Sequence, residues 1–574
     1  MRLADLAGHG AAGVDYQTVR FDYIRSADQD AGCPVRHPVV IVGAGPVGMC
    51  LAIDLAQRDV PVVLLDNDSA LSVGSRAICF AKRTLEIFDR LGVGARMLDK
   101  GVSWNVGKVF FRDELLYSFD LLPETGHAHP AFINLQQYYC EGFLAERIAE
   151  LPRVDLRWQN KVTGVDTDGN EVRLTVDTPD GPYRIVADWL VGCDGSRSTV
   201  RQLIGQESRG RVFQDRFLIA DIKMKMDRPA ERWFWFDPAF HPNQSVLLHM
   251  QPDSVWRVDF QLGWNADPEE ERRPERIKPR IDALLGRNAE YELEWASVYT
   301  FACLRMEKFR HGRVLFAGDA AHGVSPFGAR GANSGIQDAE NLAWKLERVV
   351  KGESGEALLD TYCTEREYAA DENILNSTRS TDFITPKSEI SRLFRDATLQ
   401  LARRHPFARS LVNSGRLSVP AVLRDSALNT PDTSEFAGGV EPGASAVDAP
   451  VAIHDGRTTR DGWLLRELPG RFTALLYEDG SDRAEKTLGA DRLADVARGV
   501  VPLDILRVRA PGIAPGGPCC IDREGLVAKR YDLAPGTLVL FRPDQHVCAR
   551  WRSPTGEALR TALLTATGAT LGGH

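Results

Sequence analysis

Residues 37–48 read HPVVIVGAGPVG, and this stretch decides the fold of the 574-residue chain. A continuous apolar run leads directly into Gly43, Gly45 and Gly48, which are spaced as GxGxxG. Such a run predicts a parallel strand that is buried on both faces. The first glycine permits a tight turn, the second lets a pyrophosphate approach the backbone, and the third lets a helix pack on the strand. The stretch therefore predicts the start of a βαβ unit that binds a dinucleotide.

The residues that follow supply the rest of this unit. Apolar residues recur at helical spacing over 49–56, and a second apolar strand at 62–65 ends at Asp66. A carboxylate at that place can accept hydrogen bonds from a ribose hydroxyl. Asp59 lies where such a unit often has a glycine that ends the helix. The motif does not separate NAD from FAD, and the alternative reading is a glycine-rich turn without a ligand.

The composition excludes several classes of partner. The chain is 43% hydrophobic and 26% charged, which is ordinary for a globular protein, and its net charge of -9 argues against nucleic acid or an anionic membrane. Residues 1–37 lack the pattern of a signal peptide, and no apolar run is long enough to span a membrane. We therefore expect a cytoplasmic protein with an N-terminal extension on its surface. The ten cysteines form no CxxC pattern, which disfavours a disulfide framework or a zinc site.

Two later stretches repeat the strand-and-turn arrangement. Residues 189–195 (WLVGCDG) and 313–319 (RVLFAGD) each read as an apolar strand that ends in an Asp-Gly or Gly-Asp turn. A helix is expected after each turn, from about Ser196 and from about Asn333. Asp319 is a single acid among residues small enough for a ligand to lie against the backbone, and the alternative is an acid that caps a turn.

These three motifs, in this order and at these intervals, resemble those of the class A flavoprotein aromatic hydroxylases, which include p-hydroxybenzoate hydroxylase and phenol hydroxylase. The resemblance covers about residues 38–370 and is nearest to the hydroxyphenylpropionate-hydroxylase type. It implies an FAD-dependent monooxygenase that uses NADPH or NADH as a transient co-substrate and hydroxylates a phenolic ring with O2 through a flavin C4a-hydroperoxide. The alternative is a flavin-dependent reductase or a halogenase-like oxidoreductase without aromatic hydroxylation.

The resemblance also assigns residues to the cofactor. In the family the acid of the Gly-Asp motif bonds the ribityl chain, and Asp319 takes that position. The backbone N–H groups of 331–333 begin a helix, where negative charge on the flavin is favoured, and Pro326 lies in the loop along the isoalloxazine edge. Gln136 is the rival of Gln137, because the alignment can slip by one residue. The full set of cofactor positions is Gly43, Gly45, Gly48, Asp66, Arg76, Gln137, Asp194, Gly318, Asp319, Gly331, Ala332 and Asn333.

The middle region is expected to supply a substrate-binding sheet. Its predicted strands are RWFWF (232–236), SVLLHM (245–250) and VWRVDFQLGW (255–264). Alternate residues of a strand share a face, so Arg257 and Asp259 point the same way. Arg257 matches a family arginine beside the flavin, and Asp259 would orient or deprotonate a phenol, the alternative being an ordinary salt-bridged residue. With Pro326 these two residues form the predicted catalytic set, and Trp233, Trp235 and His249 are candidate pocket residues, with the aromatic core as the alternative for each tryptophan.

The predicted fold class is α/β, with a Rossmann-like FAD-binding domain interleaved with a mixed-sheet substrate domain and followed by a thioredoxin-like domain. The expected boundaries are an N-terminal extension at 1–37, the first part of the FAD domain at 38–210 with inserted substrate-domain segments near 100–137, the substrate sheet at 211–304, the Gly-Asp motif and following helices at 305–424, a linker at 425–450, and the thioredoxin-like domain at 451–574.

The C-terminal region resembles the tail of phenol-hydroxylase relatives. Within it we expect a helix at 491–500 and strands at 501–508, 526–533 (LVAKRYDL) and 537–551. It has no CxxC, so we expect a structural or dimerisation role, which would make the protein a homodimer, rather than redox activity.

Overall fold

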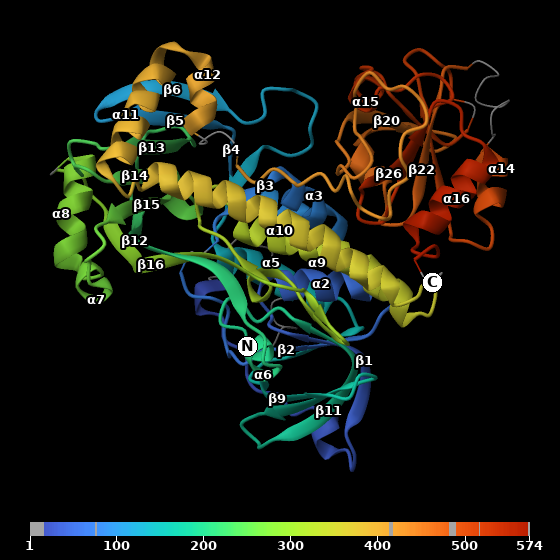
Figure 1. Ribbon diagram of the computed structural model, residues 1–574, viewed down its shortest axis with the longest axis horizontal. Coiled ribbons are helices and arrows are strands. Elements are labelled where there is room, and N and C mark those ends of the chain that lie inside the picture. The colour runs from blue at the N-terminus through green and yellow to red at the C-terminus, as the bar shows by residue number, and fades with distance from the viewer. Residues whose placement is uncertain are drawn as a thin grey trace. The chain divides into compact units, whose positions relative to one another are not determined.

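The computed structural model describes residues 16–74, 77–286, 288–412, 417–480, 490–515 and 517–571 (Figure 1). The chain divides into two compact units. Unit 1 comprises residues 1–123, 130–339 and 370–419, and unit 2 comprises residues 124–129, 340–369 and 420–574. The two long helices α9 (Gly331–Val350) and α10 (Ala357–Ile384) each contribute residues to both units. No helix in the described ranges is both long and apolar enough to cross a membrane.

Unit 1 contains the sheet that carries the glycine motif. The order along this sheet is β17 (Arg310–His311), β18 (Val314–Phe316), β11 (Tyr183–Gly192), β1 (Val35–Val42), β2 (Val62–Leu65) and β8 (Val154–Arg157). The five strands from β18 to β8 are parallel, and β9 (Lys161–Thr167) and β10 (Val172–Asp177) join β11 in antiparallel fashion. Helices α2 (Pro46–Gln57) and α5 (Gln137–Ala149) pack against each other and against this sheet. The carboxyl ends of parallel strands meet at one edge, so the three predicted motifs converge there.

The described part of the predicted N-terminal extension is built into unit 1 rather than lying on its surface. Strand β1 begins at Val35, inside the predicted extension. The ring of Tyr16 is fully buried, edge-on to Tyr139 and Phe143 of α5 at 5.7 and 5.6 Å between ring centroids. Its hydroxyl donates to Glu146 of the same helix. Aromatic side chains in this segment therefore contribute to the core, which its charge-rich sequence does not indicate.

A second sheet in unit 1 contains the three predicted substrate strands as neighbours. Its order is β19 (His322–Gly323), β16 (Glu292–Met306), β12 (Ser208–Lys223), β15 (Val255–Leu262), β14 (Ser245–Met250), β13 (Arg232–Phe236), β5 (Val106–Phe111) and β6 (Glu114–Asp120). Val258, Phe260 and Leu262 lie on one face of β15 in an apolar core that includes residues of α8 (Pro274–Leu285). Arg257 and Asp259 therefore face the other side of the sheet.

Shorter elements complete unit 1. A three-stranded sheet has the order β3 (Cys79–Ala81), β7 (Phe132–Asn134) and β4 (Val102–Trp104). The remaining α-helices of unit 1 in the described ranges are α3 (Lys82–Leu91), α4 (Gly94–Lys100), α6 (Thr199–Leu203), α7 (Pro268–Glu271), α11 (Glu389–Arg404) and α12 (Pro406–Arg409). All ten cysteines of the chain are free thiols.

Unit 2 is built on one seven-stranded sheet. Its order is β21 (Thr459–Trp463), β20 (Pro450–His454), β24 (Cys519–Ile521), β23 (Asp504–Arg509), β22 (Thr473–Glu478), β25 (Leu538–Phe541) and β26 (Val547–Trp551), with helices α14 (Ala490–Ala497) and α16 (Gly556–Ala566). The strand predicted at 526–533 is wrong, because these residues form helix α15 (Leu526–Tyr531). Val527 and Tyr531 are both fully buried, whereas Lys529 between them is exposed. In a strand all three residues would share one face, so this burial pattern matches a helix.

Candidate active site

The three glycines of the first motif differ in what surrounds them. Gly43 has a φ of 106°, and a Cβ placed there would lie 2.4 Å from the carbonyl oxygen of Cys193. A Cβ on Gly48 would lie 1.9 Å from the carbonyl oxygen of Gly43. At Gly45 a Cβ would meet no heavy atom within 4 Å. Packing therefore requires Gly43 and Gly48, while Gly45 leaves open space beside the backbone, as the close approach of a pyrophosphate needs.

Asp66 follows β2 and is anchored to the glycine turn. Its Oδ2 accepts the backbone N–H of Ala44 at 2.6 Å, and its Oδ1 accepts that of Asp68 at 2.8 Å. Burial raises the pKa of Asp66 to about 6, although these two hydrogen bonds act in the opposite direction. The carboxylate thus lies at the carboxyl end of the second strand, where it can accept a hydrogen bond from a ribose hydroxyl.

Asp194 follows β11 and keeps one oxygen available. Its Oδ2 accepts the backbone N–H of Val200 at 2.9 Å, whereas its Oδ1 is buried without a hydrogen-bond partner among the described residues. Burial raises the pKa of this carboxyl. Nearby, Arg201 of α6 donates to the carbonyl oxygens of Ser196 and Ala320 at 2.7 Å each, which ties the second motif to the third.

Asp319 lies in the short turn that follows β18. Its side chain is exposed, although Gly318 and the residue after it are buried. A Cβ on Gly331, at the start of α9, would lie 3.9 Å from Asp319 Oδ1. Asp338 of α9 holds the turn from behind, because its Oδ2 accepts the N–H of Gly318 at 3.0 Å and lies 2.6 Å from His322 Nε2. The turn therefore presents one carboxylate beside the N-terminus of a long helix.

Helix α9 begins at Gly331, two residues before the expected start. The side chain of Asn333 is committed to the protein: its Oδ1 accepts the N–H of Ala81 at 2.8 Å and the hydroxyl of Thr84 at 2.6 Å. Its Nδ2 donates to the carbonyl oxygens of Cys79 and Ala329 at 2.8 and 2.6 Å. Asn333 therefore offers a ligand its backbone N–H rather than its side chain, and the first N–H groups of any helix lack an intrahelical acceptor.

The two predicted glutamines differ in their surroundings. Gln137 accepts the N–H of Ala77 at 3.0 Å and donates to Glu141 at 2.7 Å. Gln136 is buried, donates to the carbonyl oxygen of Pro252 at 3.3 Å, and has an Oε1 without a partner in the described part of the chain. Gln136 therefore has a side-chain oxygen that is available to a ligand, whereas both polar atoms of the Gln137 side chain are hydrogen-bonded within the protein.

Two more predicted residues lie near the helix start or outside the described ranges. Arg76 lies outside the described residues. Pro326 is exposed in the loop before α9. Gly328 in the same loop has a φ of 104°, and a Cβ there would lie 1.8 Å from the guanidinium of Arg330. The loop thus has a conformation that requires glycine, with Pro326 on its surface.

The inner face of the substrate sheet, defined here as the face that carries Arg257 and Asp259, is polar at its centre. Arg257 Nε donates to Asp221 Oδ1 at 3.1 Å, and the side chain of Gln251 donates to the same oxygen at 3.1 Å. Asp259 Oδ1 is buried and accepts no hydrogen bond from the described residues. Burial raises the pKa of Asp259 to about 6, while the positive charge of Arg257 acts to lower it. Asp259 therefore changes its protonation close to neutral pH.

Two further residues on or beside this face were not predicted from the sequence, namely Arg232 and Cys79. His249 pairs with Arg257 across β14 and β15. Trp233 pairs with Leu248 across β13 and β14, so the same register brings Arg232 opposite His249. Cys79 of β3 lies beside this row, with its Sγ 3.9 Å from His249 Nδ1. The sequence feature that could have identified Arg232 is its position as the single cation at the start of an otherwise aromatic strand.

The predicted pocket tryptophans lie elsewhere. Trp233 and Trp235 belong to the apolar side of the sheet, where their rings pack with Phe110 at 5.6 and 5.0 Å between centroids. His249 is buried on the inner face. The aromatic-core alternative thus describes both tryptophans, and only the histidine lies on the polar face.

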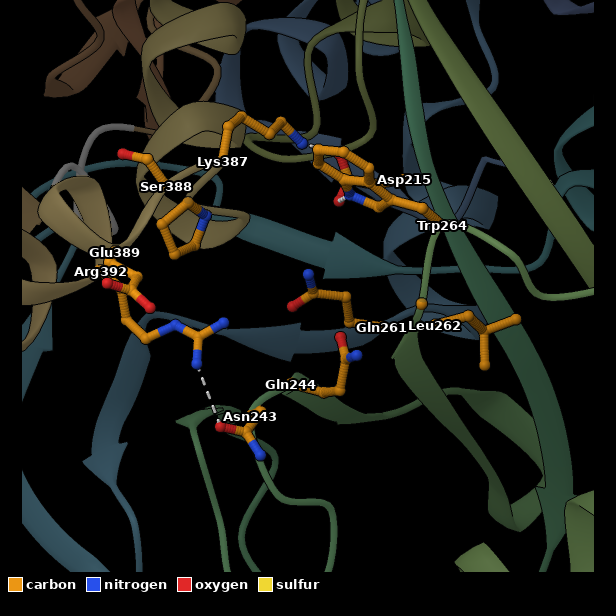
Figure 2. A pocket seen from close by; sticks show the side chains of 12 residues that line it. Asp215, Asn243, Gln244, Gln261, Leu262, Trp264, Lys387, Ser388, Glu389 and Arg392 are labelled. Carbon is orange, nitrogen blue, oxygen red and sulfur yellow. Dashed lines mark hydrogen bonds and ion pairs between the residues drawn. The ribbon is translucent and has the colours of Figure 1, made fainter.

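A cavity of about 390 Å³ opens at the carboxyl end of β15, beside Asp215 in the middle of β12 and next to the start of α11 (Figure 2). Gln261, two residues beyond Asp259 and on the same face, points into it together with Gln244. Lys387 forms an ion pair with Asp215, whose Oδ1 also accepts Trp264 Nε1 at 3.0 Å. Burial lowers the pKa of Lys387 to about 8. The cavity is lined mainly by polar side chains. Its residue Gln261 follows Arg257 and Asp259 on the same face of β15.

Comparison with known proteins agrees with this geometry. A family profile described as "FAD binding domain" matches residues 36–377, more than half of the chain. The 6-methylpretetramide 4-monooxygenase of Streptomyces rimosus is 32% identical over 550 residues, which are 92% of each chain. A 3-(3-hydroxy-phenyl)propionate/3-hydroxycinnamic acid hydroxylase of Mycobacterium sp. (strain KMS) is 28% identical over 554 residues, 93% of this chain and 92% of that one. The crystal structure of the flavin-dependent monooxygenase PieE has the same fold, with a TM-score of 0.78 at 22% identity over 93% of this chain and 100% of that one.

The chain therefore belongs to the class A FAD-binding aromatic hydroxylases. It is an FAD-dependent aromatic monooxygenase, with NADH or NADPH as co-substrate. The residues of the site fit a flavin dinucleotide on independent grounds. The backbone is open at Gly45, Asp194 has an unpartnered buried oxygen, and Asp319 is exposed beside the start of α9.

Proposed function

We propose that the enzyme hydroxylates a phenolic ring ortho or para to its hydroxyl group, and that Arg257 and Asp259 hold that hydroxyl. Bound FAD, once reduced by NADH or NADPH, supplies the activated oxygen. The observation that carries the proposal is the buried Asp259 Oδ1 without a partner, on a carboxyl whose pKa is about 6. Such a group is an acceptor for the proton of a phenol at neutral pH.

The charges around Asp259 suit this role. A ring reacts faster with electrophilic oxygen when its hydroxyl gives up its proton, because the phenolate is more electron-rich. Asp259 accepts the phenolic proton, and the guanidinium of Arg257 stabilises the negative charge that develops on the phenol oxygen. Asp221 fixes Arg257 through its hydrogen bond to Nε. Asp221 and Arg257 are buried and Asp259 is half-buried, so little water reaches this group, which strengthens these interactions.

The residues assigned to FAD lie at or near the carboxyl edge of the first sheet. We assign the pyrophosphate to the backbone at Gly45, the adenosine ribose to Asp66 and the ribityl chain to Asp319. Asp194 Oδ1 and the N–H groups at the start of α9 are assigned to the flavin end. The unpartnered atoms described above support these assignments. Gln136 replaces Gln137 as the glutamine assigned to FAD, because its Oε1 is open.

We further propose a substrate larger than a single ring. The relative named as a 6-methylpretetramide 4-monooxygenase matches along 92% of this chain. The cavity of about 390 Å³ lies on the inner face two residues beyond Asp259, which leaves space for the part of a substrate that is remote from the reacting ring. Its carboxamides, Gln244 and Gln261, are suited to carbonyl and hydroxyl substituents.

The experiment is aerobic oxidation of NADH and NADPH by the FAD-loaded enzyme, with single-ring and polycyclic phenols and with the product mass recorded. We expect stimulated oxidation together with a gain of one oxygen atom, strongest for a polycyclic phenol. Stimulation without that gain by any phenol would contradict the proposed hydroxylation. Equal rates with single-ring and polycyclic phenols would contradict the proposed substrate size.

We also propose that the C-terminal part of unit 2 is thioredoxin-like and that it supports a homodimer in the cytoplasm. Strands β22 and β23 are parallel with α14 between them in sequence, and β25 and β26 are antiparallel and are followed by α16. This βαβ and ββα arrangement supports a thioredoxin-like core. Cys519 and Cys520 are free thiols without a CxxC spacing, so the role assigned is structural. Light scattering of the purified enzyme tests the dimer, and a monomer mass would contradict it.

A further inference from the structure

The inner face carries two guanidinium groups with different surroundings. Arg257 has a carboxylate partner, Asp221, at 3.1 Å. Arg232 is only 8% exposed, yet it makes no hydrogen bond or ion pair with any residue that the structure describes. Cys79 and Asp259 are the groups whose charges act on it, and neither lies within ion-pair distance. Burial lowers the pKa of Arg232 because it disfavours the charged form.

An unpaired buried cation is strongly unfavourable for folding, and proteins rarely retain one without a ligand. Guanidinium does not lose its proton in proteins, so Arg232 cannot relieve the penalty by becoming neutral. It therefore stays charged on the inner face of the sheet, where no described residue forms an ion pair with it and the carboxylate of Asp259 acts on it only from a greater distance. This combination points to an anion that arrives with the substrate.

Other polar atoms on the inner face are open as well. His249 Nε2 and Gln251 Oε1 are buried without a hydrogen-bond partner in the described ranges. Burial lowers the pKa of His249 well below its usual value, and the charges of Arg232 and Arg257 act in the same direction. His249 is thus neutral, and one of its ring nitrogens can donate a hydrogen bond to an oxygen. Arg232 and His249 lie side by side on adjacent strands, about 5 Å apart along the sheet.

We propose that Arg232, assisted by His249, binds a negatively charged oxygen group on the aromatic substrate, either a carboxylate or an ionised enol. Arg232 is then a specificity-determining residue, placed one row of the sheet away from Asp259, which holds the reacting phenol. The substrate is an acidic aromatic compound whose charged group lies on the side of the ring system facing β13. This inference rests on the proposed function of Asp259, but it concerns binding rather than the hydroxylation step.

The test measures dissociation constants on the oxidised FAD-loaded enzyme by the change in flavin fluorescence, so that no turnover is needed. One arm compares 3-(3-hydroxyphenyl)propionate with its primary amide. The other compares 2-hydroxy-1,4-naphthoquinone, an ionised enol, with its methyl ether. We expect the wild type to bind the charged member of at least one pair about 10- to 100-fold more tightly, as a charge-assisted hydrogen bond to a buried guanidinium allows. The pair that shows the preference identifies the type of acid.

Three variants test whether Arg232 causes the preference for the charged compound. Arg232→Gln is expected to abolish the preference, and Arg232→Lys to retain part of it because the charge remains. Arg228→Gln is the matched control, since the guanidinium of Arg228 packs 4.5 Å over the ring of Trp233 on the apolar side of the sheet. We expect that control to bind both members of each pair as the wild type does.

Stability gives a second and independent readout. Because Arg232 is unpaired in the substrate-free protein, Arg232→Gln is expected to melt at or above the wild-type temperature while it loses the charge preference. A lower melting temperature would show that Arg232 is paired within the protein and would overturn the proposal. A wild type without any preference for a charged member, or a preference that persists in Arg232→Gln, would also overturn it.

A loss of FAD content in Arg232→Gln with the acid preference unchanged would place this residue at the cofactor instead. Failure of the hydroxylation assay alone would refute the role of Asp259 and leave the binding result standing. The two proposals therefore fail separately.

Discussion

Replacing Asp259 by asparagine tests the chemistry of the inner face most sharply. The side chain keeps its shape but loses the ability to ionise, so it no longer accepts a proton from the phenol. The pKa of Asp259 is raised from 3.8 to about 6 because burial disfavours its charged form, and Arg257 offsets only part of that effect. The same substitution therefore has one effect on catalysis and an opposite effect on stability.

The size of both effects follows from the structure. A pKa that moves from 3.8 to about 6 means that the ionised carboxylate destabilises the folded protein by about 3 kcal/mol at 1.36 kcal/mol per pKa unit. This destabilisation is absent below the unfolded pKa of about 4, grows as the pH rises, and is complete above about 6. For catalysis, loss of a proton acceptor lowers kcat/KM by about 100- to 10,000-fold.

The assay is a pH profile of kcat/KM together with melting of the substrate-free protein between pH 4 and 8. In the wild type kcat/KM is expected to rise with pH through about 6, where Asp259 ionises, and then to level off. Asp259→Asn is expected to lack this rise and to melt at a higher temperature than the wild type above pH 6, with the difference vanishing near pH 4. Asp227→Asn, at an exposed position, is the control and should change neither quantity.

Three results would contradict the role assigned to Asp259. The first is a wild-type activity in Asp259→Asn, which would remove this residue from the reaction. The second is a variant that melts below the wild type at pH 7.5, which would mean that the carboxylate is stabilised by a partner. The third is an unchanged pH profile in the variant, which would assign the titration to another group.

The remaining predictions concern the cofactor and unit 2. Asp319→Ala is expected to bind FAD about 10- to 100-fold more weakly, measured as flavin content after dialysis, and full flavin content would remove Asp319 from the cofactor site. Gly45→Ala should fold but bind less FAD, whereas Gly48→Ala should fail to fold because its Cβ would lie 1.9 Å from a backbone oxygen. Circular dichroism and flavin content distinguish these two outcomes, and a folded Gly48→Ala protein would contradict the packing at Gly48. Glu365→Gln should lower the stability of unit 2 by about 3–5 kcal/mol, because Glu365 is fully buried and bonds Lys345 at 2.7 Å and Arg542 at 2.6 Å, and unchanged thermal and denaturant midpoints would show that these cations are balanced otherwise.

Local patterns were sufficient to predict the four strands of the first sheet that carry the site residues. Apolar strands that end in Gly43, Asp66, Asp194 and Gly318 each carry their signal within a few residues, and the rule that parallel strands share a carboxyl edge brings them together. The alternation on β15 likewise predicted that Arg257 and Asp259 share a face. These features depend on spacing along the chain, which the sequence displays directly.

Features that depend on contacts between distant segments were not predicted. The burial of Tyr16 requires α5, which lies more than a hundred residues later in the chain. Arg232 became a candidate only when the pairing of β13, β14 and β15 placed it in one row with His249 and Arg257. The strand predicted at 526–533 was wrong because its short apolar pattern is compatible with either period. Only the exposure of Lys529 between the buried Val527 and Tyr531 separates the helix from a strand.

The most direct test of the account is to supply ¹⁸O₂ to the FAD-loaded enzyme with NADH or NADPH and a polycyclic phenol, and to compare the wild type with Asp259→Asn. The wild-type product is expected to carry one ¹⁸O atom, on a carbon ortho or para to the existing hydroxyl, and the variant is expected to give little labelled product. NAD(P)H oxidation that yields only hydrogen peroxide in the wild type with every phenol tested, or equal labelling by the two proteins, would contradict it.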